Sequence, residues 1–102
     1  MRKSELYEYL SEQIKIADYN KSICDNTVKI LYFEGQKNGY DLLYSKLKRT
    51  KGLKDFVEFA IELNKTDSNL LIARGIAEAS GFVIHWLKCK IPENLYLKYG
   101  LY

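Results

Sequence analysis

The chain has 102 residues, a length that allows one domain (residues 1–102) and leaves no room for a second. Apolar residues make up 47% and charged residues 28%, a balance that is typical of globular proteins and excludes a disordered chain. The formal net charge of +3 is too small to indicate a nucleic-acid partner by itself.

The sequence carries none of the usual signals for a membrane or an extracellular location. No stretch approaches the roughly 20 apolar residues of a membrane span, and Glu5, Glu8 and Glu12 interrupt the region that a signal peptide would keep apolar. The two cysteines, Cys24 and Cys89, are too few for a disulfide framework or a four-ligand zinc site. We expect a cytoplasmic protein with reduced thiols and no metal or cofactor, with a single bridge between the two cysteines as the alternative.

The first helix is predicted from Ser4 to about Asp18. Ser4 is a suitable N-cap, and acidic residues follow it at the positive end of the helix dipole. The apolar positions recur at intervals of three and four residues, which predicts one buried stripe along this helix. These positions are Leu6, Tyr9, Leu10, Ile14 and Ala17.

The next segment permits two interpretations. Helices over about 21–36 and 40–50, either separate or fused, agree with one apolar face, and Gly39 is then expected to form a turn or a helix break. Because Asn38 and Gly39 also form a strong hairpin signal, a short hairpin around 28–44 is the alternative. We favour the helices, because neither flanking run alternates and no third strand candidate exists.

The rest of the chain predicts three further helical segments. One runs from Leu53 to Asn64, and a long one follows a cap at Asp67 or Ser68 and ends near Lys90, before Pro92. Small residues narrow the middle of the long helix, so a neighbouring helix can approach it closely, and a short last turn covers 93–99. The predicted fold is all-α, a compact bundle of four to five helices with the 69–90 helix at its centre.

The residues with possible catalytic chemistry are few. His85 is the only histidine, and it shares a helical face with Glu78 and Arg74. No serine or cysteine nucleophile stands at a recognisable spacing from it. We interpret Arg74 and Glu78 as a surface ion pair and His85 as a solvated side chain, and we predict that the chain is not an enzyme.

A short basic segment and the tyrosines supply the candidate binding site. Five basic residues fall within residues 46–54, and without them the chain has 11 basic against 13 acidic residues. Nine tyrosines exceed what one small core needs, and tyrosine is enriched at protein interfaces. The predicted partner-binding residues are Tyr40, Tyr44, Lys48, Arg49 and Lys51, with Tyr96, Tyr99 and Tyr102 as a secondary group.

These features favour a small non-catalytic protein that binds and modulates or inhibits a protein partner. In general profile, though in no motif, the chain looks like the small helical proteins of mobile elements and bacteriocin systems, which bind and block another protein. That resemblance implies an immunity, inhibitor or anti-defence role. The alternative is nucleic-acid binding through the basic 46–54 segment, where lysine and arginine could contact phosphates.

Overall fold

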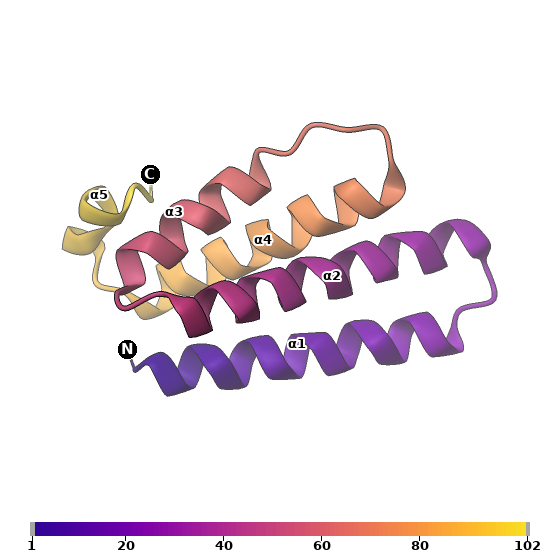
Figure 1. Ribbon diagram of the computed structural model, residues 1–102, viewed down its shortest axis with the longest axis horizontal. Helices are drawn as coiled ribbons and strands as arrows, with labels where there is room; N and C mark the ends of the chain where they lie inside the picture. Colours follow the sequence, from indigo (N-terminus) through magenta and orange to yellow (C-terminus); the bar gives the residue numbers. More distant parts are fainter. Residues whose placement is uncertain (1, 102) are drawn as a thin grey trace.

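The computed structural model describes residues 2–101, without the side chains of Tyr96 and Leu97. Within this range the chain forms helices and no strand, in an elongated bundle of 44 × 27 × 23 Å (Figure 1). The elements are α1 (Lys3–Ile23), α2 (Thr27–Arg49), α3 (Leu53–Asn64), α4 (Leu71–Lys90), a 3-10 turn η1 (Glu93–Leu95) and α5 (Tyr96–Tyr99). The predicted all-α bundle is confirmed. The hairpin alternative is wrong, because α2 is one continuous helix through 28–44.

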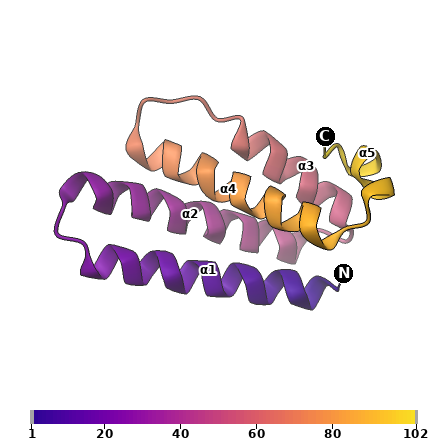
Figure 2. The ribbon, with the colours of Figure 1, turned by 180° about the vertical axis from the view of Figure 1, so that it is seen from behind.

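The four long helices alternate in direction, so α2 and α4 run parallel to each other. These two pack together along the middle of the bundle, with α1 packed beside α2 and α3 packed beside α4 (Figures 1 and 2). The predicted central helix therefore shares its position with α2. It also starts later than expected, at Leu71, where the Ser68 hydroxyl accepts a hydrogen bond from the backbone N–H of Leu70.

Glycines allow α2 and α4 to pack at close range. A Cβ atom added to Gly35 would lie 2.2 Å from the carbonyl oxygen of Ile72, and one added to Gly75 would lie 2.4 Å from that of Tyr32. One added to Gly39 would lie 2.9 Å from the Cβ of Ala79. The expected turn or break at Gly39 is wrong, because Gly39 lies within α2 and faces α4.

The core lies where all four long helices overlap, because α3 is shorter than the others and covers only one half of α4. Two polar contacts join α3 to α4 there. The buried Ser80 hydroxyl donates to the carbonyl of Ala60, and the Asn64 amide donates to that of Ala77 at 2.8 Å. The fully buried apolar side chains include Leu6, Leu10, Leu43, Leu47, Phe56, Val57, Val83 and Leu87.

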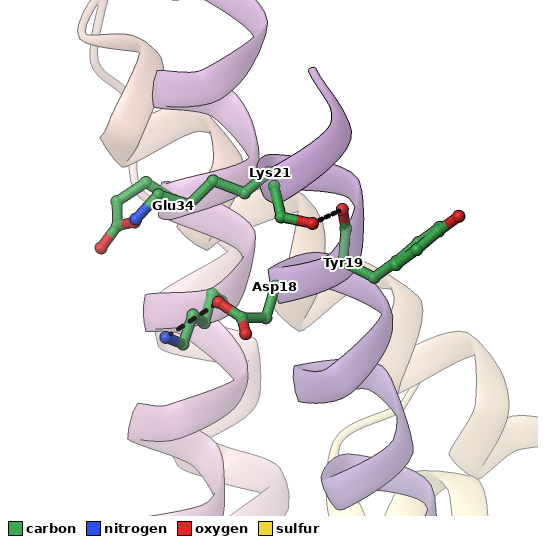
Figure 3. Close-up of polar contacts among 6 residues, drawn as sticks. Asp18, Tyr19, Lys21 and Glu34 are labelled. Carbon is green, nitrogen blue, oxygen red and sulfur yellow. Dashed lines mark hydrogen bonds and ion pairs between the residues drawn. The ribbon is translucent and has the colours of Figure 1, made fainter.

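Two ion pairs join α1 to α2 in the half of the bundle that α3 does not cover. Lys37 pairs with Asp18 at 3.3 Å, and Lys21 pairs with Glu34 (Figure 3). The ring of Tyr19 points away from α2 into solvent (Figure 3). The helix α1 continues five residues beyond its expected end at Asp18, and Lys21 lies in this extension.

The two cysteines lie at opposite ends of the bundle. Cys24 directly follows α1, and Cys89 lies in the last turn of α4 (Figure 1). Both are free thiols, so the alternative of a bridge between them is wrong.

The N-caps of the first two helices provide a matched test. Asn26 caps α2, because its side-chain oxygen accepts from the backbone N–H groups of Val28 (2.9 Å) and Lys29 (3.3 Å). Ser4, the expected cap of α1, lies inside that helix, and Arg2 occupies the cap position. We expect Asn26→Ala to lower the free energy of unfolding by about 1 kcal/mol. Ser4→Ala should change it by less than about 0.5 kcal/mol. Urea unfolding of both variants measures this, and equal effects would contradict the assignment of the caps.

Candidate functional site

The predicted partner-binding residues occupy two different environments. Tyr40 is only 3% exposed and belongs to the core, so its assignment to an exposed contact surface is wrong. Tyr44, one turn later, is half-buried, and its ring meets the edge of Tyr7 with centroids 5.2 Å apart. Lys48, Arg49 and Lys51 are exposed. The corner between α2 and α3 therefore presents cations without an exposed aromatic centre.

Several cations of this corner already contact the bundle. The Lys48 ammonium lies 4.8 Å from the centroid of the Tyr44 ring, and that of Lys46 lies 5.4 Å from the Phe59 centroid. Lys3 donates to the carbonyl of Thr50 at 2.9 Å, at the negative end of α2. Within the described residues, no hydrogen bond or ion pair holds Arg49, which stays available to a partner.

The secondary aromatic group is only partly described. Tyr99 is half-buried and packs against the core beside a shallow cavity over Ile61 and Glu62 of α3. The side chain of Tyr96 and the whole of Tyr102 lie outside the described residues.

His85 and Glu78 do not act on each other. The Glu78 carboxylate accepts a hydrogen bond from the Tyr32 hydroxyl, which also accepts one from the Gln36 amide at 3.1 Å. His85 is exposed and lies two helical turns, about 10 Å, farther along α4. The expected surface pair with Arg74 is wrong, because no ion pair joins Arg74 to Glu78 in the part of the chain that the structure describes.

A groove that the sequence analysis did not predict runs between α1 and α4, with α2 as its floor. We call it the α1–α4 groove; its volume is about 430 Å³. Polar groups are contributed by Gln13, Gln36, His85 and Cys89. The apolar and aromatic part of its lining consists of Tyr9, Ile16, Ala17, Tyr40, Phe82 and Trp86.

Two aromatic side chains from opposite walls stack on each other in this groove, and exposed apolar side chains flank it. The rings of Tyr9 and Trp86 stack with centroids 4.5 Å apart and planes inclined by 10°. Ile16 of α1 is 44% exposed and Phe82 of α4 is 51% exposed. A larger depression of about 780 Å³ follows the outer surface of α1, but apart from Tyr44 a single helix lines it. The α1–α4 groove is the site where three helices bring apolar and polar groups together.

No family model, no curated protein and no solved structure is significantly similar to this chain. None of the helices in the described range is both long and apolar enough to span a membrane. Residues 2–101 also contain no cluster of three or more histidine, cysteine or acidic side chains that could hold a metal ion.

Burial of Tyr40 predicts a change of stability at alkaline pH. Burial raises the pKa of its hydroxyl well above the ordinary value near 10. The unfolded chain therefore loses this proton first, so this contribution to stability is complete below pH about 10 and decreases above it. Above pH about 10, this titration should cost the wild-type chain up to about 1.4 kcal/mol of unfolding free energy per pH unit. Tyr40→Phe has no such hydroxyl, so we expect it to lack this part of the loss. Urea unfolding of both chains across this range measures the difference, and parallel curves would contradict the burial of the hydroxyl.

Proposed function

We propose that the chain is a non-catalytic protein that binds a protein partner, and that the α1–α4 groove holds an apolar surface of that partner. The observation that carries this proposal is the exposure of Ile16 and Phe82 on the two sides of one aromatic groove. Contiguous exposed apolar surface on a small protein marks a site of interaction. The stacked Tyr9 and Trp86 provide the kind of fixed aromatic anchor on which binding energy concentrates.

The contacts around His85 support a role in binding rather than catalysis. Its imidazole stands at the edge of the groove, while the nearest carboxylate candidate, Glu78, is engaged by Tyr32. Inhibition of the partner, immunity, an anti-defence role or an adaptor role would each follow from such binding. The cytoplasmic location predicted above belongs to the same proposal.

The basic corner is a second candidate contact. Tyr44, Lys48, Arg49 and Lys51 stay a prediction for additional contacts, with Arg49 as the strongest anchor. Nucleic-acid binding through this corner also stays a prediction. Affinity for a polyanion would fall steeply between low and moderate salt, and each lysine removed would flatten that dependence.

Site-specific photo-cross-linking tests the proposal. A photoreactive amino acid is placed at Phe82 in the groove, at Arg49 in the corner, or at the exposed Asp67 between α3 and α4 as a control. In cells of the source organism we expect one protein to be cross-linked at position 82 and not at position 67. Adducts at 49 alone would move the site to the basic corner. A nucleic-acid adduct, or no adduct at 82, would contradict the proposed function.

A further inference from the structure

The positive excess of the chain gathers at one end of the bundle. The start of α1, the end of α2, the start of α3 and the end of α4 meet at the end that carries the N-terminus (Figures 1 and 2). The segments 2–8, 44–58 and 86–93 contain nine basic against five acidic residues, and the rest of the chain contains seven against eight. We call six of these cations the basic end, which extends the basic corner: Lys3, Lys46, Lys48, Arg49, Lys51 and Lys90.

The lysines of the basic end contact aromatic rings instead of carboxylates. The ammonium groups lie over Tyr7 (Lys3, 5.9 Å from the ring centroid), Phe59 (Lys46, 5.4 Å), Tyr44 (Lys48, 4.8 Å) and Trp86 (Lys90, 5.7 Å). A ring attracts a cation but carries no net charge, so it positions the ammonium group without neutralising it. Within residues 2–101, no ion pair joins a cation of the basic end to a carboxylate, whereas Lys21 and Lys37 on the other half of the bundle have such pairs.

Contacts between the helices hold these cations next to one another. Lys3 at the start of α1 donates to the carbonyl of Thr50 at the end of α2, at 2.9 Å. Lys3 and Lys51 also line one depression of about 210 Å³ between these two elements. Five of the six cations are exposed, and Lys46 is half-buried. The basic end is therefore a surface of neighbouring positive charges, which fits a partner with several negative charges.

The rings of the basic end favour carboxylates of a protein over a nucleic acid. Single-stranded nucleic acids gain much of their binding energy by stacking bases on exposed aromatic rings. Here the four rings are half-buried, and each has an ammonium group near its face. The five acidic residues of the same end would also repel a phosphate backbone. Carboxylate side chains need only charge and hydrogen-bond donors, which lysine and arginine supply.

We propose that the basic end binds an acidic segment of the partner, next to the apolar surface that the α1–α4 groove holds. Lys90 connects the two sites, because its ammonium group lies over Trp86, which lines the groove. This inference rests on the proposed function and specifies the chemistry of the partner. The contacts are made by the ends of long side chains, so they change the backbone amide signals of 46–54 little.

A short peptide of aspartate and glutamate, with a neutral fluorescent label, tests the surface by fluorescence anisotropy. We expect it to bind the full chain, to bind less tightly as salt rises from about 50 to 200 mM, and to bind far more tightly than its asparagine and glutamine counterpart. Combining Lys48→Gln with Arg49→Gln should weaken it about tenfold. The matched control, Lys29→Gln with Arg74→Gln, removes the same charges from exposed positions outside the basic end and should change it less than about twofold.

Three results of this experiment would overturn the inference and leave the proposed function standing. The first is equal binding of the acidic peptide and its amide counterpart. The second is equal weakening by the two double variants. The third is tighter binding of a thymidine single strand with the same number of charges, which would assign the basic end to nucleic acids. Circular dichroism of both double variants checks that they fold.

Carbodiimide coupling of the complex tests whether both contacts belong to one partner, the protein captured at position 82. This reagent joins a lysine amine to a carboxylate that touches it, and mass spectrometry identifies the joined residues. We expect lysines of the basic end to be joined to aspartate or glutamate of the partner, and not the exposed Lys15 or Lys29. Coupling only to lysines outside the basic end would overturn the inference. Failure to capture any protein at position 82 would contradict the proposed function, while the peptide still decides what the basic end binds.

Discussion

Replacing Gly35 with alanine should destabilise the bundle by about 2 kcal/mol or more, although alanine favours a helix by about 1 kcal/mol over glycine. The added methyl group would lie 2.2 Å from the carbonyl oxygen of Ile72. Because this atom belongs to the backbone of α4, no side chain can rotate to make room, and the two central helices must move apart. Urea unfolding followed by circular dichroism measures the loss.

Gly52 provides the matched control. Nothing lies within 4 Å of a Cβ atom added there, and its φ of −131° is open to any residue. Gly52→Ala should therefore change the free energy of unfolding by less than about 1 kcal/mol. If Gly35→Ala were as stable as Gly52→Ala, the close packing of α2 on α4 would be wrong.

Replacing Phe82 with glutamate should weaken partner binding by more than about 30-fold, equivalent to about 2 kcal/mol. The new carboxylate would lie in an apolar groove beside Trp86. Binding of the partner would then have to remove water from this charge, which is unfavourable. The fold should survive, because the Phe82 ring is 51% exposed in the free chain. The partner that cross-linking identifies is purified and titrated against both chains, which measures binding. Unfolding curves of both chains measure stability separately.

Ile23→Glu is the control for this loss of binding. Ile23 is 63% exposed and ends α1 at the far end of the bundle, outside the groove. The substitution Ile23→Glu makes the same change from an apolar to an acidic side chain as Phe82→Glu. A general effect of added charge would therefore appear in both variants. Equal weakening by the two substitutions would show that the groove has no special role.

Local patterns in the sequence predict most of the fold. The bounds of α3 are as predicted, because an apolar stripe begins directly after Gly52 and ends at Asn64. The errors arise where contacts between helices override local signals. Asn38 and Gly39 form a turn signal, yet Gly39 is helical because α4 needs its small size. The helix expected over about 21–36 includes Asn26, whereas the Asn26 side chain caps α2, which begins at Thr27.

The sequence alone predicts much less of the candidate site. Tyr40 and Tyr44 are one turn apart and read alike in the sequence. Only the positions of α1 and α4 make Tyr40 the floor of a groove and leave Tyr44 against Tyr7. Phe82 and Trp86 share a helical face, but the same spacing would describe core residues if another helix covered them. Local periodicity cannot report which apolar face stays uncovered.

Mapping the bound surface by NMR tests the central claim most directly. Amide chemical shifts of the isotope-labelled chain are compared with and without the cross-linked partner. We predict the largest changes within residues 9–17 of α1 and 78–89 of α4, together with the indole N–H of Trp86, with small changes over 46–54. Changes confined to 44–54, with the Trp86 indole signal unmoved, would show that the partner binds the basic corner and would contradict the account.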